Sequence, residues 1–492
     1  MAGRSEPARE DAGADTPSVG MTRLQVVAFL NDLERRHDVN AMIHKGVRIW
    51  PLLRMKIGEH LIAHELADAA VLDQARRNPE SKWKQLAIGT VSLLPFHRHI
   101  ERTDLLFYTE NRFTEIWDGV AHERYADPLI GAAGELGLRS TVVEHRHGVH
   151  PPANRSIHCP RYDMSPPLAL RAALHARKPK PDPRSVVGLE ALLREVLIMG
   201  NTPTLPHLAS QLHDFDLYLD LHTRLLRESR PQCVFLVCWY ATESLAVQHV
   251  CHALGIRCVD LQHGIQGKGH LAYGPWAALP SDAYSVMPSA FWCWDEDSAN
   301  NIMAWAAATP LKALALGNPW MEGSTGFASQ PVWEEDGRTR VLYTAFLPDV
   351  LPYPVLDAIR ETRTTCQWIV RTHPGNPQLP TLIAEVLGAE GLTGNARVSR
   401  ASDLPLAAVL KGCDLHITQY SSVVLEAVSM GVPSVAIHRN AADLFAEALA
   451  SGALHIALTL DELRDHLRAP RQFHGTTTTP APLVERLRRI LQ

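Results

Sequence analysis

The chain of 492 residues lacks an excess of charge of either sign, a long apolar run and any Cys-x-x-Cys pair. Its 48 basic and 53 acidic residues give a formal net charge of -5, which provides no field for holding a nucleic-acid backbone. No stretch approaches the ~18 apolar residues that a membrane-spanning helix needs. The eight cysteines are scattered, several of them in apolar runs, which is typical of a reducing compartment. We therefore expect a cytoplasmic protein with no nucleic-acid partner.

The N-terminal segment has no apolar signal core, but residues 83–97 form one short apolar stretch accompanied by Lys82, Lys84 and Arg98. Such a stretch can rest on a membrane surface, which would bring the protein to the inner face of the cell membrane. The other interpretation is a helix packed on its own domain, and helices of this kind are commoner. Peripheral membrane association therefore remains an open alternative.

A chain of this length is too long for one compact core, so we expect two domains with extensions. Residues 1–20 are small and polar, which predicts a disordered tail. Residues 21–100 predict a helical N-terminal extension, with a second helical run that includes Ile43 and Trp50. Residues 480–492 predict an amphipathic C-terminal helix.

Residues 101–320 predict a Rossmann-like α/β domain, because buried strands alternate with helices there. Its strands are expected at 104–108, 140–145, 233–240 and 258–261. Residues 150–210 are rich in Pro and Arg and predict an insertion with one helical run, from Gly188 to Met199. A parallel sheet binds ligands at the carboxyl ends of its strands. The polar residues expected at those ends are Glu110, Arg112, Glu243, Gln262, His263 and Lys268.

Residues 335–475 predict a second domain of the same type, in which residues 413–437 are the most informative stretch. This stretch predicts a strand at 415–417, a turn, a helix that ends at Gly431 and a further strand. An earlier strand of the same domain is expected at 340–345. Ser421 and Ser422 are placed to cap the helix, beside unpaired N–H groups that favour a phosphate. Glu426 lies one helical turn further on the same face, where it can accept hydrogen bonds from ribose hydroxyls. The alternative is that the serines only cap the helix and that Glu426 faces water.

A second group of site candidates, Arg371, His373 and Pro374, lies at the carboxyl end of the expected strand 367–371 of the same domain. A cation and an imidazole at the carboxyl end of a strand can hold a phosphate, and the proline stiffens the turn. A loop with an incidental His and Arg is the competing interpretation, since the chain has 25 histidines. The Ser-Ser turn in the same domain favours the phosphate site.

Together, Arg371-x-His373-Pro374 and Tyr420-Ser421-Ser422-(x)3-Glu426-Ala-(x)3-Gly-x-Pro resemble the donor domain of GT-B glycosyltransferases. They are most similar to capsule polysaccharide (Kdo-transferase-like) enzymes, bacterial sialyltransferases and CDP-glycerol glycerophosphotransferases. The Gln262-His263-Gly264 turn also resembles capsule-biosynthesis proteins. The resemblance spans about residues 230–440. It implies a GT-B fold, two Rossmann-like domains across a cleft, and a role for His373, Ser421 and Ser422 in holding the phosphate of a cytidine-nucleotide donor.

The chain departs from the sialyltransferase pattern at the catalytic base. Those enzymes carry an acidic-acidic-Gly triplet in the first domain, whereas here Glu335-Asp336-Gly337 falls in the linker between the domains. The candidate bases are therefore sought among the residues at the strand ends of the first domain. His263 has an intrinsic pKa near neutrality, and Glu243 follows a buried strand, so either can take a proton from an acceptor hydroxyl. A structural role at the strand end is the alternative for both.

The sequence thus predicts a glycosyltransferase that uses a CMP- or CDP-linked sugar in surface or capsular polysaccharide synthesis, with a glycan or glycolipid acceptor. Acceptor contacts are expected from Glu110, Arg112, Gln262 and Lys268. No metal and no other cofactor are expected, because Arg371, His373 and a helix N-terminus can neutralise the donor phosphate. Two other functions remain open: a non-catalytic nucleotide-sugar-binding scaffold of the same fold, and a nucleotide-sugar epimerase with acid and base carboxylates deep in the cleft.

Overall fold

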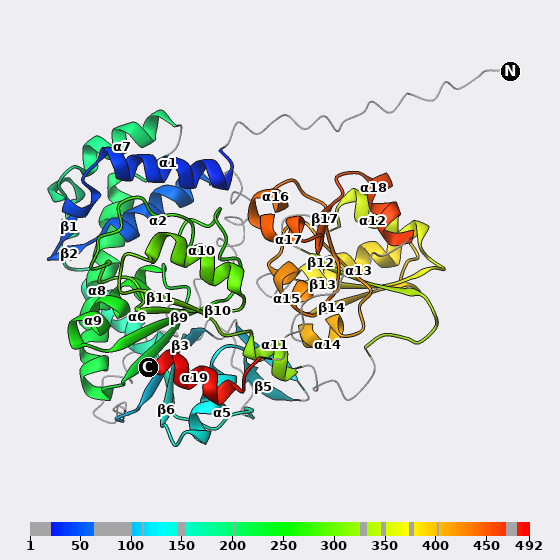
Figure 1. Cartoon of the computed structure of the whole chain (residues 1–492), viewed down its shortest axis with the longest axis horizontal. Helices are drawn as coiled ribbons and strands as arrows, with labels where there is room; N and C mark the ends of the chain where they lie inside the picture. Colours follow the sequence, from blue (N-terminus) through cyan, green and yellow to red (C-terminus); the bar gives the residue numbers. More distant parts are fainter. Residues whose placement is uncertain are drawn as a thin grey trace.

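The structure is a computed structural model in which two α/β lobes lie side by side (Figure 1). The N-terminal lobe, blue to green, carries a seven-stranded sheet, and the C-terminal lobe, yellow to orange, carries a six-stranded sheet. This confirms the expected class of two Rossmann-like domains. The residues that the structure describes are 21–62, 101–110, 113–117, 119–145, 154–199, 202–324, 332–345, 351–372, 378–400, 403–468 and 480–492.

The first sheet is entirely parallel, with strand order β11-β10-β9-β8-β3-β6-β7. Counted along the chain, this is the doubly wound order, and it reverses direction between β3 and β8. All of its strands therefore end at one edge of the lobe. The strands are β3 (Leu105–Glu110), β6 (Ser140–His145), β7 (Arg161–Asp163), β8 (Cys233–Val237), β9 (Arg257–Leu261), β10 (Ala290–Cys293) and β11 (Lys312–Ala315).

Helices cover both faces of this sheet, as continuous apolar strands require. One face packs on α6 (Ser165–His175), α8 (Leu205–Ser229) and α9 (Thr242–Leu254), where Leu225 and Val250 are buried. The other face packs on α5 (Ala126–Glu135) and on α19 (Leu483–Leu491). The C-terminal helix predicted from the sequence thus returns to the N-terminal lobe, where it is drawn in red (Figure 1).

The N-terminal helices are part of the first lobe's core. Buried side chains of α1 (Arg23–Arg36) and α2 (Trp50–Leu61) join one apolar cluster with α7 (Leu189–Ile198) and α10 (Glu296–Ala306). The prediction that Ile43 belongs to the second helix was wrong. Ile43 lies in a small hairpin, β1 (Ile43–His44) and β2 (Val47–Arg48), which turns at Lys45 and Gly46 with positive φ, and Pro51 then starts the helix.

Several elements of the first lobe differ from the sequence prediction or add to it. The third predicted strand ends at Val237 instead of reaching Tyr240, so Glu243 lies in the first turn of α9. Residues 150–210 contain β7 and α6 besides the expected helix α7. The hairpin formed by β4 (Thr114–Trp117) and β5 (Val120–Glu123), and the strands β10 and β11, were not predicted. Short 3-10 turns occur at Val39–Ala41 and Pro183–Ser185.

The second sheet is also parallel, with order β14-β13-β12-β15-β16-β17, which reverses between β12 and β15. The strands predicted around residues 340–345, 367–371 and 415–417 are confirmed, and so is the helix that ends at Gly431, where φ is 74°. The strands are β12 (Thr339–Ala345), β13 (Cys366–Thr372), β14 (Ala396–Arg400), β15 (Leu415–Thr418), β16 (Ser434–Ala436) and β17 (Leu454–Ile456).

Helices cover the second sheet as well, and α11 (Pro319–Ser324) contacts both lobes. This helix packs against α14, and Trp320 and Met321 join the apolar cluster there. The helices of this lobe are α12 (Tyr353–Glu361), α13 (Leu379–Ala389), α14 (Leu406–Leu410), α15 (Val423–Ser429), α16 (Ala441–Leu444), α17 (Ala446–Ala450) and α18 (Leu460–Arg468). Among the described helices, none is long and apolar enough to cross a bilayer. The segment 83–97 lies outside the described residues.

Candidate functional site

The loop that follows β9 joins the two lobes. A Cβ placed on Gly264 would lie 3.6 Å from the Cβ of Ser422, and one on Gly269 would lie 3.1 Å from the carbonyl oxygen of Asp443. Between them, Ile265 packs against an apolar cluster of the second lobe. The Gln-His-Gly turn therefore lies directly against the Ser-Ser turn, and the absence of a side chain matters at Gly269, where a Cβ would be tighter against the second lobe than an ordinary contact.

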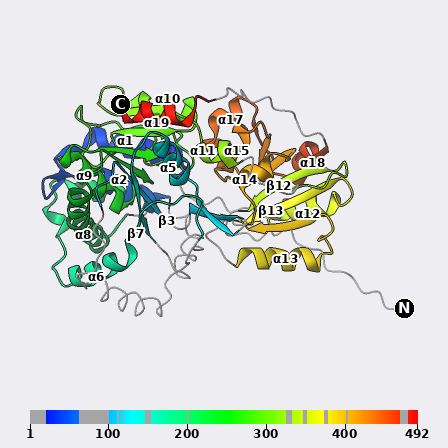
Figure 2. The same cartoon turned by 90° about the horizontal axis from the view of Figure 1, so that it is seen from below.

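The hairpin β4–β5 makes a second connection, and it does so with charge. Glu115, on β4, lies 3.9 Å from a guanidinium nitrogen of Arg371 on β13 and 3.8 Å from one of Arg124, just after β5. In the view of Figure 2, this hairpin extends in cyan from the first lobe toward β13. Glu426 of α15 belongs to the same group, because its charge acts on both arginines. We call Glu115, Arg124, Arg371 and Glu426 the interlobe cluster.

Glu426 is an incompletely satisfied member of the interlobe cluster. Its residue is 8% exposed, and its Oε2 is buried with no hydrogen-bond partner among the described residues. Burial raises the pKa of Glu426 to about 7, although Arg124 and Arg371 act in the opposite direction. A buried carboxylate oxygen without a donor is costly, so this atom is suited to accept hydrogen bonds from a ligand.

Burial also acts on the other charges of the cluster, and the ion pairs between them are long. Burial raises the pKa of Glu115 against the pull of Arg124 and Arg371, and Glu115 Oε2 has no partner in the described chain. Burial lowers the pKa of Arg371, whose NH1 donates to the carbonyl of Leu404. Ion pairs of 3.8 and 3.9 Å are too long for hydrogen bonds. The cluster thus brings two guanidinium groups close to one carboxylate, and guanidinium groups form strong charge-assisted hydrogen bonds with phosphate oxygens.

The Ser-Ser turn lies at the point where the strand order of the second sheet reverses. The Ser421 N–H donates to Thr418 Oγ1 at 3.2 Å, and its hydroxyl accepts from the Val423 N–H at 3.3 Å. Ser422 is the N-cap of α15, and within the described structure its side chain makes no capping hydrogen bond. Of the two serines, only Ser421 therefore makes the local capping hydrogen bond that was the alternative to ligand binding.

At the carboxyl edge of the first sheet, Glu243 is held firmly. It accepts from Nε2 of His222 at 2.8 Å and from Nε2 of His145 at 3.0 Å, and Nδ1 of His222 accepts from the Tyr108 hydroxyl at 3.0 Å. Burial alone would raise the pKa of Glu243, but the two hydrogen bonds outweigh burial and hold it well below its usual range. These contacts of Glu243 lead to His145 and His222 rather than to His263.

His263 faces a thiol and a phenol. Its Nε2 lies 3.0 Å from Sγ of Cys238 and 3.4 Å from the hydroxyl of Tyr240. Its carbonyl oxygen accepts a long hydrogen bond, 3.5 Å, from the hydroxyl of Tyr125. The imidazole is thus held at the carboxyl edge of the first sheet, one residue before Gly264 and the contact with Ser422.

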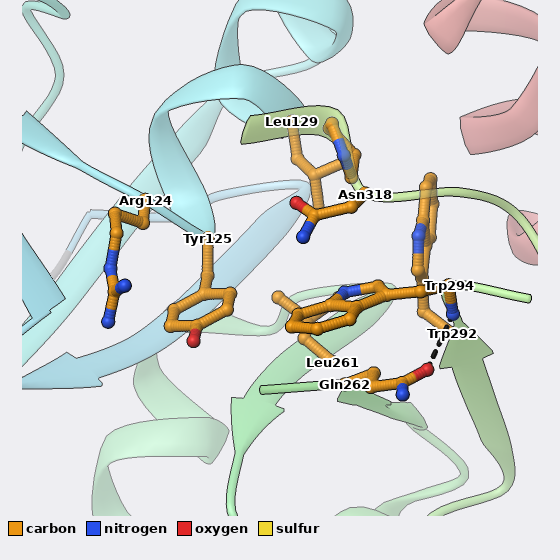
Figure 3. A pocket seen from close by; sticks show the side chains of 9 residues that line it. Arg124, Tyr125, Leu129, Leu261, Gln262, Trp292, Trp294 and Asn318 are labelled. Atoms are coloured by element: carbon orange, nitrogen blue, oxygen red, sulfur yellow. Dashed lines mark hydrogen bonds between the residues drawn. The ribbon is translucent and has the colours of Figure 1, made fainter. Parts of the chain in front are cut away.

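A hollow opens beside this edge, between the start of α5 and the ends of β9 and β10 (Figure 3). It is small and open to solvent, with internal space for about one water molecule. Arg124 and Tyr125 lie on one side and Trp294 and Gln262 on the other. Gln262 is buried and fully engaged, since its side chain donates to the carbonyl of Gly264 at 2.9 Å and accepts from the Trp294 N–H at 2.6 Å. The expected acceptor contact Gln262 therefore fixes the shape of the turn.

The remaining predicted residues divide into two groups. Lys268 is exposed in the loop next to the second lobe, and Glu110 pairs in register with His145 at the end of β3. Arg112, His373 and Pro374 lie outside the described residues. Within the described parts of the chain, no three His, Cys, Asp or Glu side chains converge in a group that could hold a metal ion.

Four residues at this site were not predicted from the sequence: Glu115, Arg124, Tyr125 and Cys238. The first three belong to the hairpin or follow it directly, and the polar residues around it gave no clear strand period. Cys238 was read as part of a buried strand. A positive φ of 62° at this residue marks the end of β8, and such a conformation in a non-glycine residue leaves no signal in composition.

No family model matches the chain, and no curated protein matches it. Solved structures that resemble it include UDP-GlcNAc 2-epimerase from Methanocaldococcus jannaschii, at 12% identity and a TM-score of 0.47 over 79% of this chain and 99% of that one. The epimerase from Neisseria meningitidis bound to UDP-GlcNAc has 14% identity and a TM-score of 0.45, over 79% and 98%.

The glycosyltransferase SnogD from Streptomyces nogalater has 17% identity and a TM-score of 0.41, over 80% of this chain and 94% of that one. Similarities of this size do not assign an activity to the chain. The two-domain architecture follows from its own strand orders and from the contacts between its lobes.

Proposed function

We propose that the protein is a glycosyltransferase that takes a sugar from a nucleotide-activated donor held between its two lobes. The observation that carries this proposal is the buried Glu426 Oε2, which lacks a partner in the described chain and adjoins two arginines. Two ribose hydroxyls would supply the donors that this oxygen lacks. The donor phosphate would then lie next to Arg124 and Arg371, where charge-assisted hydrogen bonds are strong.

The Ser-Ser turn supports the same donor position. Ser422 faces the first lobe beside Gly264, one helical turn before Glu426, so a phosphate near Ser421 and Ser422 continues from a ribose at Glu426. His373 and Pro374 keep the role that their motif implies, as part of the phosphate contacts. The metal-independent mechanism proposed here uses these cations and N–H groups to stabilise the leaving phosphate.

The acceptor hydroxyl is proposed to lose its proton to His263. The imidazole lies at the edge of the first lobe, next to the contact with the donor turn. In the proposed step it takes the proton of the acceptor hydroxyl, whose oxygen attacks the anomeric carbon from the side opposite the leaving phosphate. This arrangement favours an inverting transfer. Glu243 is the second candidate for this chemistry, acting through His145, which it holds. Glu110, Arg112 and Lys268 are proposed to surround the acceptor, a glycan or glycolipid, while Gln262 shapes the turn beside it.

The finer assignments rest on the motifs. The resemblance to capsule and sialic-acid enzymes supports a cytidine nucleotide, surface polysaccharide synthesis, and work on the cytoplasmic side of the membrane. Incubation with CMP-, CDP- and UDP-activated sugars, with and without acceptor glycans, followed by mass spectrometry, tests transfer directly. A sugar added to an acceptor, together with release of CMP or CDP, is the expected result. Transfer from UDP-sugars alone would overturn the cytidine assignment.

Glu426→Gln tests the donor site separately. The amide cannot accept as strongly from two hydroxyls, and hydrogen bonds to charged groups contribute about 1.5–3 kcal/mol, so nucleotide affinity should fall about ten- to hundredfold. Glu135→Gln, an exposed change at the end of α5, is the matched control and should leave affinity unchanged. Equal affinity of wild type and Glu426→Gln would contradict the proposed donor position.

An epimerase of nucleotide sugars is the second candidate, and one observation favours it. Such an enzyme needs acid and base carboxyls in the cleft, and burial raises the pKa of both Glu115 and Glu426 there. Incubation in D₂O separates the two functions: epimerisation exchanges a ring hydrogen without an acceptor, whereas transfer does not. A scaffold protein would bind the nucleotide and yield neither product.

A further inference from the structure

A thiol occupies the switch point of the first sheet. Cys238 directly follows β8, the strand at which the order reverses relative to β3, and crevices at this position of doubly wound sheets hold ligands. Its Sγ lies 3.0 Å from Nε2 of His263, and the residue is partly exposed. The thiol is thus within reach of both an imidazole and small solutes.

The fold enforces this orientation. Cys238 has φ of 62°, a strained conformation for a non-glycine residue that persists only where the surroundings impose it. The surroundings here are buried hydrogen bonds on the next residue: the Trp239 N–H donates to Asp260 at 3.0 Å, and its carbonyl accepts from Gln248 at 2.7 Å. The turn is therefore held with Sγ toward His263.

The other cysteines offer a contrast within the same chain, since all eight are described. Five are buried. Of the two others that are partly exposed, Cys413 donates to the carbonyl of Leu415 at 3.1 Å, and burial raises its pKa to about 12. Burial also raises the pKa of Cys159. A thiol reacts as its thiolate, so neither is suited to be a nucleophile.

A ligand position adjoins the pair independently of the thiol. Gly264, next to His263, contacts Ser422, and one turn further along α15 lies the buried Glu426 oxygen that lacks a partner in the described structure. Tyr125, which bonds the His263 carbonyl, directly follows Arg124 of the interlobe cluster. Whatever satisfies Glu426 and Arg124 thus lies close to the Cys238–His263 pair.

We propose that Cys238 is a modification site built into this cleft: His263 accepts the thiol proton, and the thiolate attacks small electrophiles that enter between the lobes. With an alkyl halide, the S–C bond forms, the C–halogen bond breaks, halide leaves and His263 releases the proton to solvent. The adduct occupies the side of His263 that an acceptor hydroxyl needs, so turnover stops. This last consequence, and shielding by bound nucleotide, rest on the proposed function.

Alkylation rates at each cysteine test the proposal in the intact protein. Iodoacetamide is added from pH 5 to 9, and modified peptides are quantified by mass spectrometry. At pH 7, Cys238 should react roughly tenfold or more faster than Cys159 and Cys413, with a rate that levels off below the pH range of an ordinary thiol. A Cys238 rate equal to that of Cys159, rising with pH as a free thiol does, would overturn the proposal.

Two variants locate the cause. His263→Gln should slow alkylation of Cys238 about tenfold while leaving Cys159 unchanged, and near-ultraviolet circular dichroism reports whether the fold is kept. If that variant fails to fold, Tyr240→Phe with the pH profile replaces it: the profile should remain, because the phenol lies farther from Nε2 than the thiol does. A profile lost in Tyr240→Phe, or a Cys238 rate unchanged in folded His263→Gln, contradicts the pairing.

A third arm separates this proposal from the proposed function. Saturating CMP and UDP are added before iodoacetamide, and turnover of wild type and Cys238→Ser is followed after alkylation. Shielding of Cys238, with residual turnover of Cys238→Ser that resists iodoacetamide, supports both proposals. Fast alkylation of Cys238 with no shielding by either nucleotide would support the activated thiol and contradict the donor position between the lobes.

Discussion

Two carboxylates on opposite lobes of this protein, the half-buried Glu243 and the buried Glu426, differ in how they are satisfied. Glu243 accepts from His222 at 2.8 Å and from His145 at 3.0 Å, and these bonds hold its pKa well below the usual range. Glu426 has a buried Oε2 with no partner in the described chain, and burial raises its pKa to about 7. Burial alone therefore does not mark a site.

What distinguishes the two is whether the fold completes their hydrogen bonds. A satisfied network such as that of Glu243 rigidifies the strand ends, which is a structural role with a functional consequence. An unsatisfied one, as at Glu426, costs stability and is kept where a ligand completes it. The difference assigns positioning to the edge of the first sheet around Glu243 and ligand binding to the interlobe cluster.

The first prediction separates turnover from nucleotide binding, and it has the largest expected change. His263→Gln removes the proposed base, and general base catalysis contributes about 10²–10⁴-fold, so turnover should fall by roughly 10³. The nucleotide-dependent rise in melting temperature should remain, because the donor contacts lie mainly on the other lobe. Steady-state kinetics and a thermal-shift titration measure the two. Loss of both together would mean that His263 only supports the fold.

The second prediction concerns stability. Glu243→Ala leaves His145 and His222 without their acceptor in a buried site, and breaking such a pair costs about 3–5 kcal/mol. Glu426→Ala removes an oxygen that has no partner among the described residues, so the free energy of unfolding should fall by much less. Urea unfolding followed by tryptophan fluorescence measures both variants. Equal losses would contradict the distinction between the two carboxylates.

Much of the fold could be predicted because the strands are continuous apolar runs. Residues 140–145 match β6 at both ends, and Gly431 ends its helix with positive φ as expected. The switch points, and hence the edges that carry sites, follow from alternating strands and helices. The hairpin β4–β5 could not be predicted because its residues show no clear alternation of apolar and polar side chains. Glu115 and Arg124 were missed for the same reason.

The candidate site could be predicted only for residues that lie at or just after the end of a predicted strand. Ser422, Glu426, Arg371 and His263 all lie where the sequence placed them relative to their strands. Their partners could not be predicted, since Glu115 with Arg371 and Cys238 with His263 meet through tertiary packing and are far apart in the sequence. The partners of Glu243 likewise come from β6 and α8, which no local pattern links to it.

The third prediction uses pH, because the pKa values of the two carboxylates are shifted in opposite directions. Glu426 has a raised pKa of about 7, so it binds its proton more tightly in the folded state, and stability falls as pH rises from about 4.5 to 7. Glu243 has a lowered pKa, so its contribution is present above about 4.5 and is lost as pH falls further. Melting temperatures from pH 4 to 8 measure both.

Glu426→Gln should remove the loss between pH 4.5 and 7, so the variant gains stability over wild type as pH rises through that interval. Glu243→Gln should instead lose its disadvantage as pH falls below about 4.5. Glu135→Gln, on an exposed position, is the control for the change of net charge. Identical pH profiles for wild type and Glu426→Gln would show that the carboxyl is already satisfied.

The last prediction concerns Glu115 of the interlobe cluster and its effect on nucleotide affinity. Glu115 lies 3.8 Å from Arg124 and 3.9 Å from Arg371, so its charge competes with a donor phosphate for the same two cations. Glu115→Gln keeps the size of the side chain but removes that competition, and pairs at such distances contribute up to about 1 kcal/mol. Nucleotide affinity should therefore rise about threefold, as measured by calorimetry. If Glu115 instead holds the arginines in the geometry that the phosphate needs, affinity falls in Glu115→Gln, and the carboxylate belongs with Glu243 as a positioning group.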